Sequence, residues 1–590
     1  MSNERLLLSA EQFAGIAAGY GDAGAMAVLA AGQLAKRKAL IAMVLRAARP
    51  TRHGAALQPA VALIGRAEDA DEAAVAGVLA HPHLDAWATL CLHRLADAER
   101  AEAPADPGDD LGFLAAYAVA AAVAAGLTFD IEVPTVDGAA TVPGLGRATG
   151  LGPGPARFAA TASGLRCTGA NGVVVDRDGP GWQALRSVDL GGWRLAIEDQ
   201  DPYRDCYGWR PLPTLADSRA GHLEKLLVDA WQLIEQEHPR HAETLRHSLR
   251  CVVPLATPAG GALVSAASRH ACGSVGAGVP DTAADLALLL IHEYMHAKLG
   301  ALLDLCELHT DGREARLHAP WRLDPRPTGA LLQGIYAHAG VTDYWRTRRH
   351  APDGDPRRAA AQFAYWRAMN RIAIENLISG GELTDAGMYF ATTLRSTLDD
   401  WEGEKIAPDI ASRAYLFVTA QTVRWLLRNA QADPRESQRL LGHLRFGTPL
   451  GSVAERGSVA DGAVATPADA PGLLGELHRW LDGRTEPVGP SGPDPSTPGT
   501  MLLNGDATGA EAAFLARLDA DAADDEAWVG MSVAWALAEG AQDRSDPSGA
   551  LVHRLLPTRP ELVKDVVLEL QRDGHPKAAT ELLKAGWTNQ

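Results

Sequence analysis

The sequence predicts a predominantly helical α+β protein, because two kinds of local pattern alternate along its 590 residues. Residues 1–127 are rich in Ala and Leu, which favour helices, and helical periodicity dominates again in residues 355–431. Residues 128–204 instead carry many Gly and Pro together with short β-branched runs, a pattern typical of hairpins or a small sheet. A chain of this length is too long for one core, so we expect several domains.

Composition suggests where those domains begin and end. We expect a helical N-terminal region in residues 1–127, a β-rich subdomain in 128–204 and the main domain in 205–445. Residues 446–506 are rich in Gly, Pro, Ser, Thr and Asp, which predicts a linker or a loop. Residues 507–590 contain paired amphipathic helical patterns and resemble tetratricopeptide-type packing.

Charge and cysteine usage exclude several classes of function. A formal net charge of −18 argues against nucleic-acid binding, which needs dense Lys and Arg. The six cysteines are scattered without C-x-x-C spacing, so we expect a reducing, cytoplasmic compartment. No basic segment precedes an apolar stretch at the N-terminus, so no signal peptide is predicted. The uncharged stretch 111–129 is mostly Ala and is flanked by Asp, which favours a buried helix over a membrane span.

One pentapeptide carries the strongest chemical signal in the chain. His292-Glu293-Tyr294-Met295-His296 follows the apolar run 286–291, in a helix that Thr282 can cap. Residues four apart lie on the same face of a helix, so His292 and His296 can bind one metal ion. The pattern H-E-x-x-H is most often a zinc hydrolase, in which Glu293 would act as the general base.

Two apolar runs before this helix predict buried strands, at residues 251–255 and 261–265, joined by a Thr-Pro-Ala-Gly-Gly turn. A strand pair before an H-E-x-x-H helix resembles the catalytic domains of zinc peptidases. We therefore expect a zincin-like metal-site core, with a helical N-terminal region before it and a helical C-terminal region after it.

The third metal ligand has to come from another segment. Leu299 and Leu302 stand where the metzincin extension requires Gly and His. Asp304 lies roughly 12 Å along the helix from His296, too far to share the ion. His338, among small and apolar neighbours on a predicted helix, is the preferred ligand, although such a histidine can equally be part of a core. His318 and Glu382 are the reserve candidates.

Two arginines stand in a proline-stiffened turn with one aspartate. Arg322 and Arg326 flank Asp324, and Trp321 precedes them. Guanidinium groups bind carboxylates with two hydrogen bonds, so the pair is suited to a dicarboxylate ligand. The alternative is a structural Arg–Asp pair that holds the turn.

Taken together, these motifs resemble a known family. The resemblance covers roughly residues 205–430 and is carried by residues 251–255, 265–268, 292–296, 319–327 and 334–338. The chain resembles the H-E-x-x-H peptide-modification proteins of ribosomal peptide natural-product clusters, whose members are iron(II)- and α-ketoglutarate-dependent peptide β-hydroxylases. The resemblance implies an oxidoreductase of the dioxygenase type. Iron(II) would be bound by His292, His296 and a third ligand, and Arg322 or Arg326 would bind the distal carboxylate of α-ketoglutarate.

Three functions follow, in order of preference. The first is a dioxygenase that β-hydroxylates a ribosomally made precursor peptide. In this case Glu293 is not a general base; it orients a ligand or completes the metal site as a carboxylate. The second is a zinc metallopeptidase in which Glu293 activates water. The third is a scaffold with a structural metal, whose helical tail binds peptides.

Overall fold

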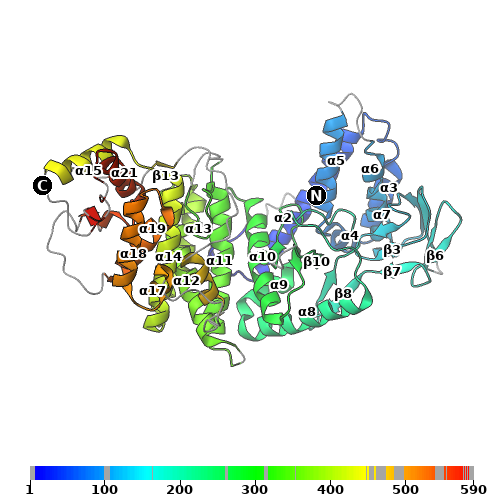
Figure 1. Cartoon of the computed structure of the whole chain (residues 1–590). Coiled ribbons are helices and arrows are strands. Elements are labelled where there is room, and N and C mark those ends of the chain that lie inside the picture. The colour runs from blue at the N-terminus through cyan, green and yellow to red at the C-terminus, as the bar shows by residue number, and fades with distance from the viewer. Residues whose placement is uncertain are drawn as a thin grey trace. The chain divides into compact units, whose positions relative to one another are not determined.

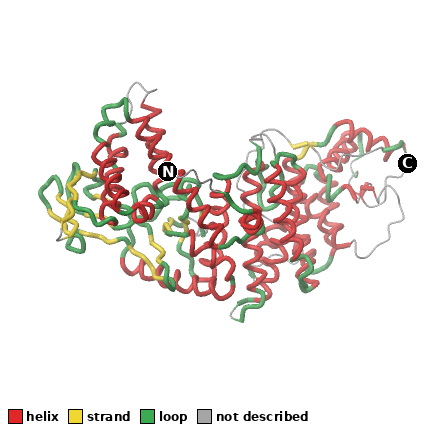
Figure 2. The backbone as a smooth tube through the Cα atoms, turned by 180° about the vertical axis from the view of Figure 1, so that it is seen from behind, coloured by secondary structure: helices red, strands yellow, loops and turns green. Residues whose placement is uncertain are grey.

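The computed structural model describes residues 7–98, 106–161, 164–258, 263–310, 317–352, 354–446, 448–450, 458–459, 473–483, 497–538, 551–552, 554–575, 577, 580 and 582–583. The chain forms two compact units, residues 1–307 and 308–590, which are described one at a time (Figure 1). Helices predominate in both units (Figure 2). The predominantly helical α+β class expected from the sequence is therefore confirmed.

The first unit begins with helices that surround an apolar core. They are α1 (Ala10–Ala17), α2 (Ala23–Ala48), α3 (Gln58–Ala70), α4 (Glu72–Leu79), α5 (Leu84–Ala98), α6 (Gly108–Gly112) and α7 (Leu114–Ala124). Polar side chains cap the N-termini of several of these helices. Ser9 forms a capping box with Gln12 at the start of α1, and Asp22 caps α2. Helix α7 packs on α3 and α4 and is buried from Leu114 to Ala122. The uncharged stretch is thus a buried helix, as expected.

Two antiparallel sheets follow. One has the strand order β1 (Phe129–Val133), β4 (Ala156–Thr161), β5 (Gly164–Thr168), β6 (Val174–Asp176), and the other β2 (Ala140–Val142), β3 (Gly146–Ala148), β7 (Trp182–Ala184). Burial alternates along β1, with the side chains of Phe129, Ile131 and Val133 inside and those of Asp130 and Glu132 outside. Strands β1 and β2 both contact α7, so these sheets share the core of the N-terminal helices.

A third, mixed sheet supports the H-E-x-x-H helix. Its strand order is β11 (Ser265–Ala266), β12 (Ser274–Gly278), β10 (Cys251–Leu255), β9 (Arg194–Ile197), β8 (Arg186–Asp189). Strands β12, β10 and β9 are parallel, and the two outer strands are antiparallel to their neighbours. Helices α8 (Asp217–Glu237), α9 (Pro239–Ser248) and α10 (Ala283–Leu303) complete the unit, and α10 contacts β11 and β12.

The predicted hairpin is wrong in its pairing. The strand at residues 251–255 is present, but its partners are the parallel strands β12 and β9. Every residue of β10 is buried, as expected for an inner strand of a parallel sheet. Of the second predicted run, residues 261–262 lie outside the described residues. Ser265 begins β11, which pairs with β12 and not with β10.

The second unit is almost entirely helical. Its helices are α11 (Thr328–Arg348), α12 (Pro356–Ser379), α13 (Asp385–Asp400), α14 (Pro408–Asn429), α15 (Pro434–Phe446), α16 (Leu473–Leu481), α17 (Pro498–Leu503), α18 (Ala507–Ala520), α19 (Asp525–Ala538) and α21 (Pro560–Arg572). The short strands β13 (Ala430–Gln431) and β14 (Ser458–Val459) pair antiparallel to each other. One apolar core runs from α12 through α14 to the C-terminal helices.

This packing differs from the predicted domain boundaries. The main domain expected at residues 205–445 is divided between Glu307 and Leu308. Its C-terminal helices share a core with the region expected at 507–590, because α14 packs on α19 and α15 on α21. The linker expected at 446–506 contains α16, whose Leu473, Leu477 and Trp480 are buried in that core. The centre of the predicted linker lies outside the described residues.

Helix α10 meets the length and composition of a membrane span. Among the described helices it is the one that does so, with 21 residues. However, 67% of its apolar window is buried inside the structure. Burial of this extent is typical of a core helix. It accounts for the apolar residues that surround the H-E-x-x-H motif.

Candidate metal centre

The H-E-x-x-H helix is fixed by local signals at its start. Thr282 is the N-cap of α10, and its hydroxyl oxygen accepts a 3.1 Å hydrogen bond from the backbone N–H of Asp285. The Asp285 carboxylate lies in the first turn, where it interacts favourably with the helix dipole. The helix therefore begins where the sequence predicted.

Three polar contacts hold the buried middle of α10 in place. The Tyr294 hydroxyl donates a 2.8 Å hydrogen bond to the backbone carbonyl of Thr244 in α9. The amine of Lys298 donates 2.8 Å hydrogen bonds to the carbonyls of Gly19 and Tyr20, which precede α2. Burial lowers the pKa of Lys298 to about 7. These contacts fix the rotation of the helix, and therefore the direction in which its histidines point.

His292 and His296 lie together on one face, as predicted. Their ring centroids are 4.9 Å apart, and the rings stand edge-on at 88°. One ligand atom of each, with one carboxylate oxygen of Glu293, lies within 4.8 Å of the others. Since a metal–imidazole bond is about 2.0–2.1 Å long, two nitrogens at this separation can bind one ion after small side-chain rotations. The residues present therefore fit a transition metal.

Glu293 is held by the edge strand of the mixed sheet. Its side chain is buried, and its Oε1 accepts a 2.6 Å hydrogen bond from the hydroxyl of Ser265 in β11. The same Oε1 lies 3.9 Å from Nε2 of His292. Burial raises the pKa of the Glu293 carboxyl, while His296 and hydrogen bonds from Ser265 and Ala267 offset part of that rise. A carboxylate fixed in this way can orient a ligand or accept a proton.

His338 lies in the second unit, on α11. Its Nδ1 is 2.7 Å from the carbonyl oxygen of Gly334, to which it donates a hydrogen bond. The ring stacks on Trp366, with centroids 4.3 Å apart, and also contacts Trp321 at 4.4 Å. Within the described part of the second unit, no trio of His, Cys, Asp or Glu surrounds it. Metal-binding histidines commonly donate a hydrogen bond from one ring nitrogen to a backbone carbonyl in this way.

Arg322 and Arg326 also lie in the second unit, and both bind Asp324. Nε of Arg322 donates to Oδ1 at 2.8 Å, and an Nη of Arg326 donates to Oδ2 at 3.1 Å. Burial alone would raise the pKa of Asp324, but the two arginines outweigh it and hold that pKa below its ordinary value. The structural Arg–Asp pair considered from the sequence is therefore present.

The reserve ligands have structural contacts in the second unit. The ring of His318 is buried, with its centroid 4.4 Å from that of Trp425. Glu382 accepts a hydrogen bond from the Thr328 hydroxyl at the start of α11, and its carbonyl accepts one from the Thr310 N–H. Glu382 thus helps to hold the first turn of α11.

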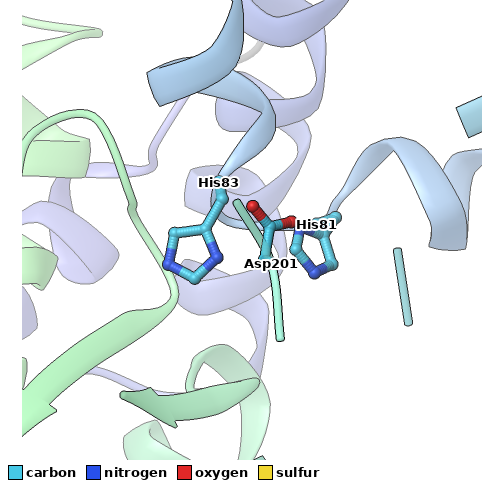
Figure 3. Close-up of side chains that lie close together, drawn as sticks. All are labelled: His81, His83 and Asp201. Carbon is cyan, nitrogen blue, oxygen red and sulfur yellow. Dashed lines mark ion pairs between the residues drawn. The ribbon is translucent and has the colours of Figure 1, made fainter. Parts of the chain in front are cut away.

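A second group of metal-ligand residues was not predicted. His81, His83 and Asp201 come together in the first unit, each with one ligand atom within 4.8 Å of the others (Figure 3). Burial lowers the pKa of His83 to about 3, so its imidazole is neutral. The sequence held a weak signal, His81-Pro82-His83 and a Glu-Asp-Gln-Asp run at 198–201. These two segments become neighbours only in the folded chain.

Comparison with known proteins does not assign a function to these groups of residues. No protein-family model matches the chain, and no curated protein matches it.

Proposed function

We propose that this chain is a metal-dependent enzyme that modifies a peptide at His292 and His296. The preferred reaction is β-hydroxylation of a ribosomally made precursor peptide with iron(II) and α-ketoglutarate. The observation that carries the proposal is the group of His292, Glu293 and His296 beside the edge strand β11. The choice of iron and α-ketoglutarate over zinc rests on the resemblance to the peptide β-hydroxylases.

Strand β11 supports a peptide as the substrate. It ends the strand order of the mixed sheet and pairs on one side with β12. Within the described residues no strand pairs with its other side. Because Ser265 of β11 hydrogen-bonds to Glu293, the strand lies directly beside the two histidines. An extended peptide that adds to this edge would bring its own backbone and side chains to the metal pair.

The residues of the chain have separate tasks in this reaction. His292 and His296 would hold the ion, whereas His338, the third ligand expected from the sequence, belongs to the second unit. Iron(II) with α-ketoglutarate would activate O2 to hydroxylate an unactivated C–H bond, with one oxygen atom entering the peptide and the other entering succinate as α-ketoglutarate loses CO2. Glu293, fixed by Ser265, would orient what binds at the pair, and β11 would align the peptide.

The arginine pair is compatible with binding of a dicarboxylate. Arg322 and Arg326 carry two positive charges and share the single negative charge of Asp324. Their side chains are 47% and 33% exposed, so both keep donors accessible to solvent. A carboxylate can therefore still bind to this turn through charge-assisted hydrogen bonds. This supports the role that the resemblance gives to the two arginines.

An anaerobic titration of the iron(II)-loaded protein with α-ketoglutarate tests the proposal. We expect a visible charge-transfer band that disappears when His292 and His296 are both replaced by Ala. The band should also require a higher α-ketoglutarate concentration in Arg322→Ala and Arg326→Ala. Arg357→Ala is the matched control, because Arg357 forms an exposed pair with Asp409 in the same unit. Absence of the band in the wild-type protein would contradict the proposal.

The second candidate is a zinc metallopeptidase, which one specific observation favours. Glu293 is buried beside both histidines with its carboxylate fixed, as a general base for water requires. Zinc would supply a water molecule with a lowered pKa. If the iron protein shows no band while zinc binds tightly at the pair, incubation with a peptide library and mass analysis of the fragments is the test. The scaffold hypothesis remains only if removal of the metal changes neither peptide hydroxylation nor peptide cleavage.

A further inference from the structure

Three hydrogen-bond acceptors face one another in the interior of the first unit. They are Nδ1 of His81, Nδ1 of His83 and Oδ2 of Asp201, and none of the three has a hydrogen-bond partner. Nδ1 of His81 is 3.8 Å from Oδ2 of Asp201, which is too long for a hydrogen bond. Figure 3 shows the carboxylate of Asp201 between the two imidazole rings. Lone pairs gathered in this way, away from water, are costly unless a metal ion or a proton lies among them.

The partners of His83 determine which of its nitrogens carries the proton. The Tyr207 hydroxyl donates a 2.6 Å hydrogen bond to Oγ of Ser274. Its oxygen therefore accepts from Nε2 of His83, 3.0 Å away. With the proton on Nε2, the lone pair of Nδ1 points at the centre of the group. Tyr207 is itself fixed, because a Cβ on Gly276 of β12 would come within 2.9 Å of its ring.

Nε2 of His81 faces the carboxylate of Glu198. Oε2 of Glu198 lies 3.4 Å from Nε2 of His81. The other oxygen of Glu198 accepts the backbone N–H groups of Gln200 and Asp201, at 3.1 and 2.9 Å, so the carboxylate cannot turn away. An imidazole that donates to a carboxylate from one nitrogen and binds a metal with the other is a common arrangement in metalloproteins.

We propose that His81, His83 and Asp201 bind a divalent transition-metal ion, with Glu198 and Tyr207 orienting the two imidazoles. Two imidazole nitrogens and one carboxylate oxygen form a ligand set suited to zinc or iron(II). The set leaves at least one position on the ion for a water molecule or a substrate group. His81 and Glu198 also line a cavity of about 530 Å³, which lies beside the proposed site.

This site is separate from the pair on α10. His81 and His83 lie between α4 and α5, and Asp201 follows β9. The proposal goes beyond the proposed function and does not rest on it. A protonated His81 between Glu198 and Asp201 is the alternative account of the same residues. That account leaves the 3.8 Å gap and the unpaired Nδ1 of His83 unexplained.

Metal content tests the proposal independently of the α10 pair. The full chain with His292→Ala and His296→Ala is stripped with a chelator, loaded with Zn²⁺, dialysed and analysed for zinc. We expect one zinc per chain, falling to none when Asp201→Asn or His83→Gln is added. No zinc in the doubly substituted chain, or one zinc retained after Asp201→Asn, would overturn the proposal.

Two further variants make the result specific. Asp199→Asn is the matched control, because Asp199 is buried in the same loop but binds Arg186 and the backbone of Leu215. It should retain one zinc. Glu198→Gln keeps all three ligands and should weaken zinc binding about 10- to 100-fold, as loss of an orienting partner does. Circular dichroism of the zinc-free variants shows whether each one folds, and unchanged affinity in a folded Glu198→Gln chain counts against the proposal.

Discussion

The hydroxyl of Ser265 donates a 2.6 Å hydrogen bond to the buried carboxylate of Glu293. This contact joins the edge strand β11 to the H-E-x-x-H helix. It fixes the carboxylate beside His292 and His296, and it places the edge of the mixed sheet beside the same pair. In the proposed function, the chemistry at the histidines and the binding of an extended peptide would therefore both depend on this contact.

Glu293→Gln should separate hydroxylation from peptide hydrolysis. The amide oxygen of Gln can still accept the hydrogen bond from Ser265, so the position of the side chain persists while its ability to accept a proton is lost. A hydroxylase should keep α-ketoglutarate turnover, measured as succinate formed by the iron-loaded protein in air, within about tenfold of wild type. A peptidase should lose about 100- to 10,000-fold of its cleavage rate, as expected when a general base is removed. Loss of all succinate formation in a folded variant would argue against the hydroxylase.

Ser265→Ala should destabilise the first unit by about 1–3 kcal/mol, because it removes a donor from a buried carboxylate. Glu293 would retain the hydrogen bond from the backbone of Ala267. Urea unfolding of the full chain measures the change. Ser218→Ala, on the exposed side of α8, is the control and should stay within about 0.5 kcal/mol of wild type. Equal stability of the two variants would show that the contact contributes little.

Two substitutions of His338 distinguish a metal ligand from a packed ring. His338→Phe keeps an aromatic ring between Trp321 and Trp366, whereas His338→Ala removes both ring contacts. The Ala variant should lose about 1–3 kcal/mol of stability, and the Phe variant much less, because each aromatic pair contributes about 0.5–1.5 kcal/mol. If His338 is the third ligand, both variants should lose the iron–α-ketoglutarate band. Retention of the band in the Phe variant would remove His338 from the ligand set.

The elements that could be predicted from sequence are those with local signals. Helix α10 begins at Thr282 because the cap and the acidic first turn lie within a few residues of each other. The partner of β10 could not be predicted in this way. Strand β12 is rich in glycine and resembles a loop, and it becomes a strand because it pairs with β10 and packs against Tyr207. Helix α16 had a readable apolar pattern, but the Gly- and Pro-rich segments around it favoured a loop.

The same distinction applies to the candidate sites. His292 and His296 are one helical turn apart, so spacing alone placed them together. His81 and Asp201 belong to segments far apart in the sequence, and they become neighbours only in the folded chain. Asp324 lies between Arg322 and Arg326 in the sequence, so their pairing could be predicted locally, and both guanidinium groups bind its carboxylate.

The carboxylate at the C-terminal end of α10 should make the stability of the first unit depend on pH. Asp304 accepts hydrogen bonds from Gln33 and Lys36 of α2 and from Arg269. Partial burial alone would raise its pKa, but these donors outweigh that effect and hold the pKa below its ordinary value. The folded protein therefore binds this proton less readily than the unfolded chain does. Stability from this group is present above the unfolded pKa of about 3.9 and is lost as the pH falls below it.

We expect the urea midpoint of wild type to exceed that of Asp304→Asn at pH 6, and the difference to shrink towards pH 3. A difference that stays constant over this range would show that the three donors do not act through the charge of Asp304.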